Sequence, residues 1–315
     1  MTDPAHKRYE VPLGEELTLP KTSGNAASAK YEVALEADAA SFHLVVSRKG
    51  SSSVKMIDTS LGGLIYSEHF LQFVTKVAST DVYGMGENYE TSFKHDFNYK
   101  THPLFTNGRA PTRDRDLYGV HPFYTVVEQD GKAHGIFLLN SNAMAFTTMP
   151  TPALSIKALG GILDFFVFVG DSPEHVVQLY TSVVGRPVMP PFWGLGFQLS
   201  RYGYKNLTHM QKVINRNINN HVPIDVNYLD IDYMDEYRDF TYDHTRFKGL
   251  PEYMKETKAK NGFYWVVITD PVIQGDKPGY RAFDEGYKRD VFVKWPASIP
   301  MAQRTKPGKA PMDKS

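Results

Sequence analysis

Residues 192–232 read FWGLGFQLSRYGYKNLTHMQKVINRNINNHVPIDVNYLDID, and this segment predicts a parallel β-α-β arrangement. Phe192–Leu199 and Asp225–Ile231 are apolar runs that are typical of buried strands. Between them, Leu207–Asn220 carries apolar side chains at helical spacing, which predicts a helix with one face toward a sheet. A strand, a helix and a second strand in this order form a parallel pair with a right-handed crossover.

The alternation of strand and helix continues downstream. Leu250–Lys260 predicts a second helix, and Phe263–Thr269 predicts a third strand, which Asp270 and Pro271 follow. Three such strands fit either the start of a (β/α)8 TIM barrel or an open doubly wound sheet. No Gly-rich phosphate loop follows any of the strands, which argues against a nucleotide-binding sheet, and we expect no cofactor. The residues after Phe192 amount to about half of the ~250 that a complete barrel needs.

The preceding half of the chain is mostly β. Pro173–Val184 predicts a helix that begins after Ser172 and ends at Gly185, and it connects the two halves. We therefore predict an N-terminal antiparallel β-sandwich with this connector helix over 1–185, part of a barrel with about three βα units over 186–296, and a disordered tail over 297–315. The sandwich prediction rests on short β-rich runs separated by turn residues: Tyr31–Leu35, Phe42–Ser47, Thr125–Glu128, Gly135–Leu139 and Leu163–Val169.

Composition excludes several classes of function. The 315-residue chain has 35 Lys and Arg residues and 35 Asp and Glu residues, and this balance gives no reason to expect nucleic acid or an anionic membrane as partner. The absence of cysteine excludes disulfides, thiol catalysis and cysteine-ligated metal sites. The N-terminal residues contain no apolar core of a signal peptide, and no apolar run approaches the ~20 residues of a membrane span. Composition alone leaves the compartment open.

Acidic residues gather around the second predicted strand, and Asp230 stands at the carboxyl end of that strand. In barrels and open α/β sheets this edge carries the active site. Two interpretations stay open for Asp230: a carboxylate that accepts hydrogen bonds from ligand hydroxyls, or a helix cap in a solvated loop. The spacing does not match a calcium loop, which requires a Gly and a terminal Glu, and we expect no metal. The full cluster is Asp225, Asp230, Asp232, Asp235, Glu236 and Asp239.

The loops after the other two strands offer one candidate each. Tyr202 follows the first strand, where it either stacks on a ligand ring or packs within its loop. Asp270 follows the third strand in the equivalent place, and as Asp-Pro it is also a common turn former.

Motifs along the chain add a family resemblance. Together with the segment quoted above, they closely resemble glycoside hydrolase family 31, the α-glucosidase family, from about Arg8 to Pro296. The resemblance implies a β-sandwich packed on a (β/α)8 barrel, with α-glucan oligosaccharides as substrates. It also implies retaining hydrolysis by two carboxyl groups about 5–5.5 Å apart. The motifs are Ser23–Ala27, Val82–Glu87, Lys94–Lys100, Leu139–Met144 and Gly161–Phe165.

The resemblance also assigns roles to single residues. Asp230 matches the family aspartate that binds hydroxyls of the terminal glucose, Ile231 lines the same pocket, and Tyr202 matches a wall residue. Asp270 lies where the family has another strand-end aspartate near the site. Gly108, within the stretch Phe105–Pro111, stands where the family carries a substrate-binding aspartate.

The catalytic carboxylates of the family find no match in this chain. The nucleophile motif should follow the fourth barrel strand and the general acid the sixth. We therefore expect the 315-residue chain to be a fragment of an α-glucosidase that is inactive by itself. The alternatives are a non-catalytic carbohydrate-binding protein and a non-functional truncated product.

Overall fold

The computed structural model describes residues 3, 5, 7–12, 28–37, 42–50, 54–108, 110–113, 115–275 and 277–294. The chain divides into two compact units, Met1–Pro187 and Val188–Ser315, which are described separately. The Ser23–Ala27 motif and the predicted tail over 297–315 lie outside the described residues. Among the helices of the described segments, none has the length and apolar character that a membrane crossing requires.

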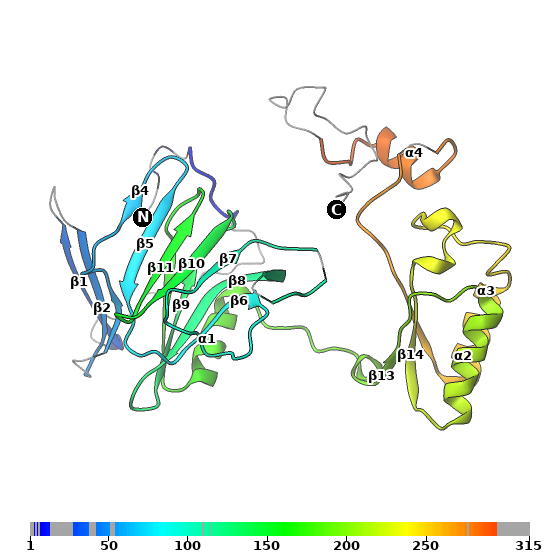
Figure 1. The fold of residues 1–315 in the computed structure, drawn as a ribbon, viewed down its shortest axis with the longest axis horizontal. Helices are drawn as coiled ribbons and strands as arrows, with labels where there is room; N and C mark the ends of the chain where they lie inside the picture. Colours follow the sequence, from blue (N-terminus) through cyan, green and yellow to red (C-terminus); the bar gives the residue numbers. More distant parts are fainter. Residues whose placement is uncertain are drawn as a thin grey trace. The chain divides into compact units, whose positions relative to one another are not determined.

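The first unit contains two antiparallel sheets (Figure 1). The strands of the smaller sheet run in the order β12 (Phe165–Gly170), β9 (Ala133–Leu138), β8 (Asp116–Val127) and β6 (Val82–Asn88). The larger sheet follows the order β1 (Tyr31–Ala37), β2 (Phe42–Arg48), β3 (Lys55–Asp58), β5 (Leu71–Lys76), β11 (Ala153–Ala158), β10 (Met144–Met149) and β7 (Thr101–Leu104), with β4 (Ile65–Tyr66) paired to β5.

Buried side chains from both sheets form one hydrophobic core. Phe73 and Phe146 of the larger sheet belong to the same cluster as Tyr124 and Leu138 of the smaller one. Burial alternates along β5 and β10, as expected for strands with one face on a core. The larger sheet therefore buries one face, whereas β9 of the smaller sheet is buried along its whole length.

The helix α1 (Pro173–Val184) covers the other face of the smaller sheet. Its bounds are those predicted from the sequence. The Ser172 hydroxyl accepts a hydrogen bond from the backbone N–H of His175 at 3.2 Å and caps the helix. Val176 and Val183 pack in a cluster with Phe137 and Phe168 of the sheet. The helix therefore completes the first unit at the point where the chain leaves it.

A buried charge cluster joins β2 and β9 through Glu128, the residue that directly follows β8. The Glu128 carboxylate contacts Arg48 through two hydrogen bonds of 2.7 and 2.8 Å, and Nδ1 of His134 lies 2.8 Å from its Oε1. The Arg48 guanidinium also donates to the carbonyls of Ala133 and Gly170. Burial lowers the pKa of His134, although the Glu128 carboxylate opposes this effect. The imidazole is therefore neutral, and its protonation would add an uncompensated positive charge to the core.

This cluster predicts that acid weakens the fold. The unfolded chain binds a proton at His134 near pH 6.5, but the folded chain does so only at lower pH. The contribution of His134 to stability is therefore complete only above pH 6.5 and falls as the pH drops, by at most about 1 kcal/mol of unfolding free energy between pH 6.5 and 5.5. Urea unfolding at both values measures this loss. His134→Asn, which keeps a donor for Glu128, should reduce the loss, whereas His69→Asn on the surface should leave it unchanged. An equal pH dependence in the His134 variant would contradict this account.

The second unit is built on three parallel strands. These are β13 (Phe197–Leu199), β14 (Ile224–Leu229) and β15 (Tyr264–Val267), with β14 in the centre. Two helices, α2 (Leu207–Asn219) and α3 (Leu250–Asn261), connect them. The predicted alternation of strand and helix is therefore present.

The apolar face of α2 packs where the sequence pattern places it. Met210, Val213 and Ile214 join a second hydrophobic cluster with Leu229 of β14 and Leu250 of α3. The side chain of Asn206 caps the helix by accepting from the backbone N–H of His209 at 2.8 Å. Short 3-10 helices η3 (Ile231–Tyr233) and η4 (Asp235–Tyr237) follow β14, and α4 (Arg281–Lys288) follows β15.

One predicted strand was wrong over half of its length. Phe192–Leu199 was predicted as a single strand, but Phe192–Leu195 forms the 3-10 helix η2, and only Phe197–Leu199 is strand. The turn is closed by a 2.9 Å hydrogen bond from the N–H of Gly194 to the carbonyl of Pro191. An apolar run with two glycines does not distinguish these conformations, because periodicity alone cannot identify a short buried strand.

Gly196, between η2 and β13, permits a close approach of Asp225. The carboxylate Oδ2 of Asp225 accepts from the N–H of Phe197 at 3.0 Å. A Cβ atom at Gly196 would lie 2.0 Å from this oxygen and 2.9 Å from Cβ of Asp225. The position therefore requires the absence of a side chain.

We expect Gly196→Ala to destabilise the second unit by about 1–3 kcal/mol, because the Asp225 side chain must shift and its hydrogen bond is lost. Chemical denaturation measures the change. Gly194→Ala is the matched control, since its Cβ would meet only ordinary contacts at 3.6 Å. Equal stabilities of the two variants would refute the steric argument.

Candidate functional site

The ends of three neighbouring parallel strands carry the candidate residues. Tyr202 lies in the loop after β13, Asp230 directly follows β14, and Asp270 lies three residues beyond the end of β15. Because β13, β14 and β15 are parallel and adjacent, these three loops meet at the same edge of the sheet. Such edges carry the binding sites of parallel α/β sheets.

Asp230 caps the 3-10 helix η3. Its Oδ1 accepts a 2.7 Å hydrogen bond from the backbone N–H of Ile231, so the capping interpretation applies to this oxygen. Within the described part of the chain, no hydrogen bond reaches the other carboxylate oxygen, Oδ2. Both residues are half-buried, and Ile231 packs against the second hydrophobic cluster. One oxygen therefore fixes the carboxylate and the other is available to a ligand.

Tyr202 is an exposed aromatic residue with 67% of its surface accessible. On its C-terminal side, Tyr204 is buried in the second hydrophobic cluster and anchors the loop. Between them, Gly203 has a φ of +113°, in the left-handed region where glycine is favoured. The ring of Tyr202 is free to stack on a flat apolar face, such as one face of a sugar ring.

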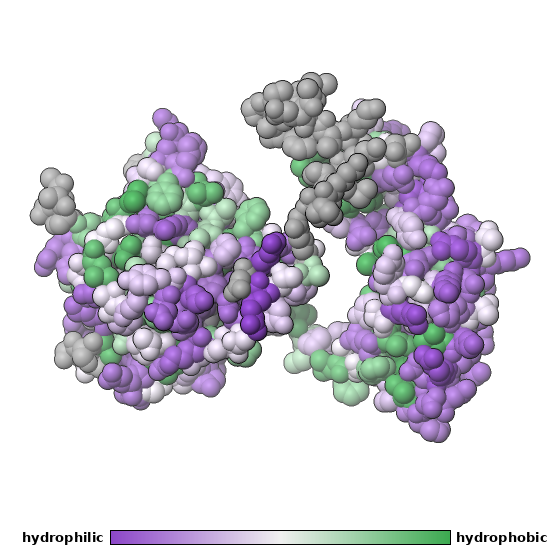
Figure 2. Space-filling view, in the orientation of Figure 1, coloured by the Kyte–Doolittle hydropathy of each residue, from purple (hydrophilic) through white to green (hydrophobic). Residues whose placement is uncertain are grey.

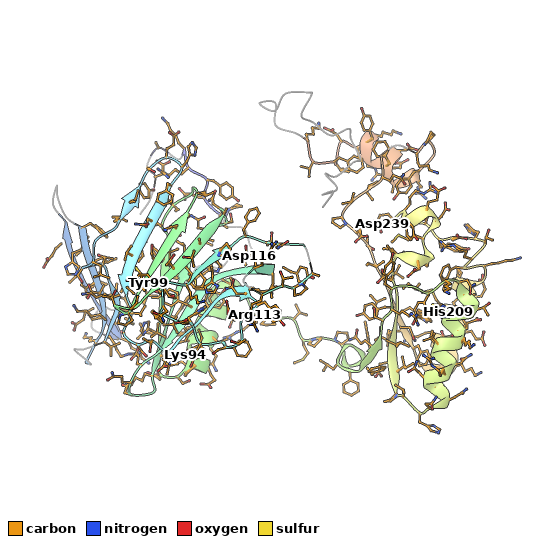
Figure 3. The ribbon with its side chains drawn as sticks, viewed as in Figure 1. Lys94, Tyr99, Arg113, Asp116, His209 and Asp239 are labelled. Carbon is orange, nitrogen blue, oxygen red and sulfur yellow. The ribbon has the colours of Figure 1, made fainter. Side chains whose placement is uncertain are left out.

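Asp270 is exposed, and its backbone rather than its side chain is held. Its N–H donates to Oδ1 of Asp239 at 3.2 Å. Asp239, labelled in Figure 3, lies on the loop after β14 and is only 4% exposed. Burial raises the pKa of Asp239, an effect that the hydrogen bond from Asp270 opposes. The carboxylate of Asp270 remains available at the edge of the sheet.

The other acidic residues near β14 have protein partners. Asp235 pairs with Arg238, and Glu236 pairs with Lys277. Farther along the same loop, Asp243 accepts a 2.7 Å hydrogen bond from Arg246, which lowers the pKa of Asp243 to about 2. Asp225 and Asp232 accept backbone N–H groups of the β13 region. Most of the acidic cluster therefore maintains the loop structure.

Backbone strain is concentrated in the same loop. Glu236, Tyr237 and Phe240 have φ values of 54°, 58° and 61°, in a region that non-glycine residues rarely adopt. Tyr237 and Phe240 are also exposed, by 60% and 73%. Strained residues of this kind often mark functional loops.

An open cavity of about 780 Å³ lies between this loop and α4. This volume is within the range of small-molecule sites. Its lining combines apolar surface with charged groups and includes Phe240, Thr241, Tyr280, Arg281, Glu285 and Phe292.

Gly108, in the first unit, is exposed. A side chain there would meet nothing within 4 Å, so the fold itself would admit an aspartate at this position. The neighbouring Arg109 lies outside the described residues. The match of Gly108 to the substrate-binding aspartate of the family stays a prediction.

Nothing in the described segments brings together three His, Asp or Glu side chains that could hold a metal ion. The edge of β13–β15 presents carboxylates and an aromatic ring. Such groups bind hydroxyl-rich molecules by hydrogen bonds and by stacking.

Sequence reasoning missed the partners of Asp232 and Asp239. Both belong to the acidic cluster that the sequence identifies, but their hydrogen bonds to Gly203 and Asp270 span 29 and 31 residues. It also missed the stack of Trp193 on Tyr264, whose ring centroids lie 4.3 Å apart. Position at a strand end was the only signal, and it does not identify a distant partner.

Comparison with known sequences places these features in a family. Residues 187–313 match the "Glycosyl hydrolases family 31 TIM-barrel domain". The chain is 42% identical over 295 residues to intestinal sucrase-isomaltase of Oryctolagus cuniculus, covering 93% of this chain and 16% of that protein. It is 39% identical over 308 residues to lysosomal alpha-glucosidase of Mus musculus, covering 97% and 31%. The chain thus spans about a sixth to a third of the length of these curated relatives.

Solved structures show the same fold. A glucosidase II alpha subunit superposes with a TM-score of 0.74 at 21% identity, covering 84% of this chain and 34% of that one. A family 31 alpha-glucosidase from Bacteroides thetaiotaomicron superposes with a TM-score of 0.59 at 27% identity, covering 67% and 35%.

Proposed function

Because the chain belongs to glycoside hydrolase family 31, we propose that it forms the sugar-binding part of an α-glucosidase. In this proposal the first unit is the β-sandwich with its connector helix, and the second is the first three βα units of the catalytic (β/α)8 barrel. The substrate is an α-glucan oligosaccharide of the maltose type, hydrolysed with retention.

The observation that carries the proposal is the convergence of three loops at one edge of the sheet. Asp230 offers an unpaired carboxylate oxygen, Asp270 offers an exposed carboxylate, and Tyr202 offers an exposed ring. Carboxylates accept hydrogen bonds from sugar hydroxyls, and aromatic faces pack on the C–H face of a pyranose. Ile231 supplies an apolar wall beside Asp230.

The proposal does not include the two catalytic carboxyl groups. By resemblance, the nucleophile and the general acid of the family follow later barrel strands, and no residue among 1–315 takes their place. We therefore assign the 315-residue chain a role in binding and orienting the glucose unit. Bond cleavage requires the two carboxyl groups of a complete site.

Titration of the chain with maltose tests the proposal. Isothermal calorimetry should show saturable binding with a dissociation constant of about 1 mM, which corresponds to about −4 kcal/mol. Cellobiose, the β-linked isomer, is the matched control and should bind more weakly. Absence of saturable maltose binding, or equal binding of the two disaccharides, would refute the assignment.

A further inference from the structure

Two carboxylates of the loop after the central strand hold the loops on either side. Oδ2 of Asp232 accepts a 2.8 Å hydrogen bond from the backbone N–H of Gly203, in the loop after β13. Oδ1 of Asp239 accepts a 3.2 Å bond from the N–H of Asp270, in the segment after β15. The loop after β14 is therefore tied to both neighbours through main-chain amides.

We propose that Asp232 and Asp239 are positioning residues, which fix Tyr202 and Asp270 relative to Asp230. This inference rests on the proposed sugar site. The proposal concerns only the hydrogen bonds that these two carboxylates accept from backbone amides, and it assigns neither residue a contact with the substrate. Their effect on binding is exerted through the loops that they hold.

The environment of Tyr202 explains why such a tie is needed. Its ring is mostly exposed, so packing does not fix the side chain. Gly203 adopts a left-handed conformation, and a Cβ atom there would meet nothing closer than Nε of Arg201 at 3.9 Å. No close contact with a neighbouring atom therefore restrains the backbone at Gly203. The hydrogen bond that Asp232 accepts from the N–H of Gly203 holds the peptide group that joins Tyr202 to Gly203, and with it the backbone position from which the ring extends.

Asp239 acts on Asp270 in the same manner. Its side chain is almost fully buried, and its backbone carbonyl accepts a 2.9 Å hydrogen bond from the hydroxyl of Tyr280. Asp239 is thus fixed on two sides before it binds the amide of Asp270. A buried carboxylate costs stability unless it is hydrogen-bonded. Asp239 therefore contributes to the site by ordering the segment after β15.

Paired substitutions test the inference. Asp232→Leu removes the acceptor at nearly constant size, whereas Asp232→Asn keeps an oxygen that can accept the N–H of Gly203. In the leucine variant, amide hydrogen exchange at Gly203, followed by NMR, should accelerate at least ~10-fold, since one hydrogen bond is worth about 1.4 kcal/mol. The maltose dissociation constant should rise about tenfold. The asparagine variant should restore both quantities to within about threefold.

Asp239→Leu and Asp239→Asn form the equivalent pair for the amide of Asp270. Asp243→Leu is the control, because the side chain of Asp243 accepts hydrogen bonds only from Thr245 and Arg246 among the described residues. It should leave exchange at Gly203 and Asp270 unchanged. Accelerated exchange in this control would overturn the assignment to specific bonds.

The two readouts separate the possible failures. If the wild-type chain binds no maltose, the proposed function fails, and exchange at Gly203 still tests the tie. Unchanged exchange in the leucine variants overturns the inference. Faster exchange with unchanged maltose affinity overturns the positioning role, and the hydrogen bond then stabilises the loop without affecting binding. If a leucine variant does not fold, the matching alanine variant takes its place, and unchanged exchange at Gly203 in Asp232→Ala overturns the inference.

Discussion

Asp230→Ala is expected to lower the catalytic efficiency toward maltose about 100-fold. The variant is best measured in a chimera, in which residues 8–294 replace the matching segment of mouse lysosomal alpha-glucosidase, which is 39% identical to this chain. A carboxylate that accepts hydrogen bonds from substrate hydroxyls contributes about 1.5–3 kcal/mol for each bond. Loss of about 2.8 kcal/mol corresponds to a factor of 100.

The structure supplies the controls for this measurement. Asp230→Asn retains the shape of the side chain and one acceptor, so its loss should be smaller. Asp243→Asn alters an acidic residue of the same loop that pairs with Arg246, and it should retain nearly full activity. A loss below tenfold for Asp230→Ala would remove Asp230 from the sugar site.

The second large effect concerns the chain by itself. Residues 1–315 alone should hydrolyse p-nitrophenyl α-glucoside at least ~10⁵-fold more slowly than the chimera. The reason is that removal of a catalytic nucleophile costs about this much in other hydrolases. The assay follows release of p-nitrophenol over days.

Contaminating glycosidases are the main alternative source of a signal in that assay. Any turnover should therefore be compared with that of Asp230→Ala purified in the same way. Turnover that depends on Asp230 and persists through repeated purification would contradict the prediction, and it would place a catalytic pair within these residues.

Helices and strands were predicted well where capping residues or the spacing of apolar residues determine them. The helix α1 was predicted to the residue, because Ser172 caps its start and Gly185 ends it. Apolar spacing predicted the face of α2 that packs on the strands. In contrast, β6 contains Gly84 and Gly86, which weaken strand propensity, and it forms through its pairing with β8. Pairing partners cannot be identified from one strand alone.

For the candidate site as well, features set by nearby residues could be predicted, and long-range contacts could not. Strand ends are visible in the sequence, so Tyr202, Asp230 and Asp270 could be predicted to share one edge. The hydrogen-bond partners of the acidic cluster could not be predicted, because the bonds of Asp232 and Asp239 join residues about 30 positions apart. Contacts at such separations depend on the register of β13, β14 and β15, which spacing does not encode.

The exposed segment at the start of the second unit, residues 188–192, affects how the chain should be measured. Figure 2 shows hydrophobic surface there, and Val188, Met189 and Phe192 are each at least 85% exposed. Exposed apolar surface promotes association between molecules. Binding and exchange measurements on the chain should therefore be made at several protein concentrations.

The ties from Asp232 and Asp239 to main-chain amides have a consequence for protein engineering. Every amino acid except proline supplies the N–H that such a carboxylate requires. Side chains at Tyr202 and Asp270 can therefore be randomised in a library while the loops keep their anchors, provided that Gly203 retains its left-handed backbone. Selection on such a library would explore new sugar preferences on an unchanged scaffold.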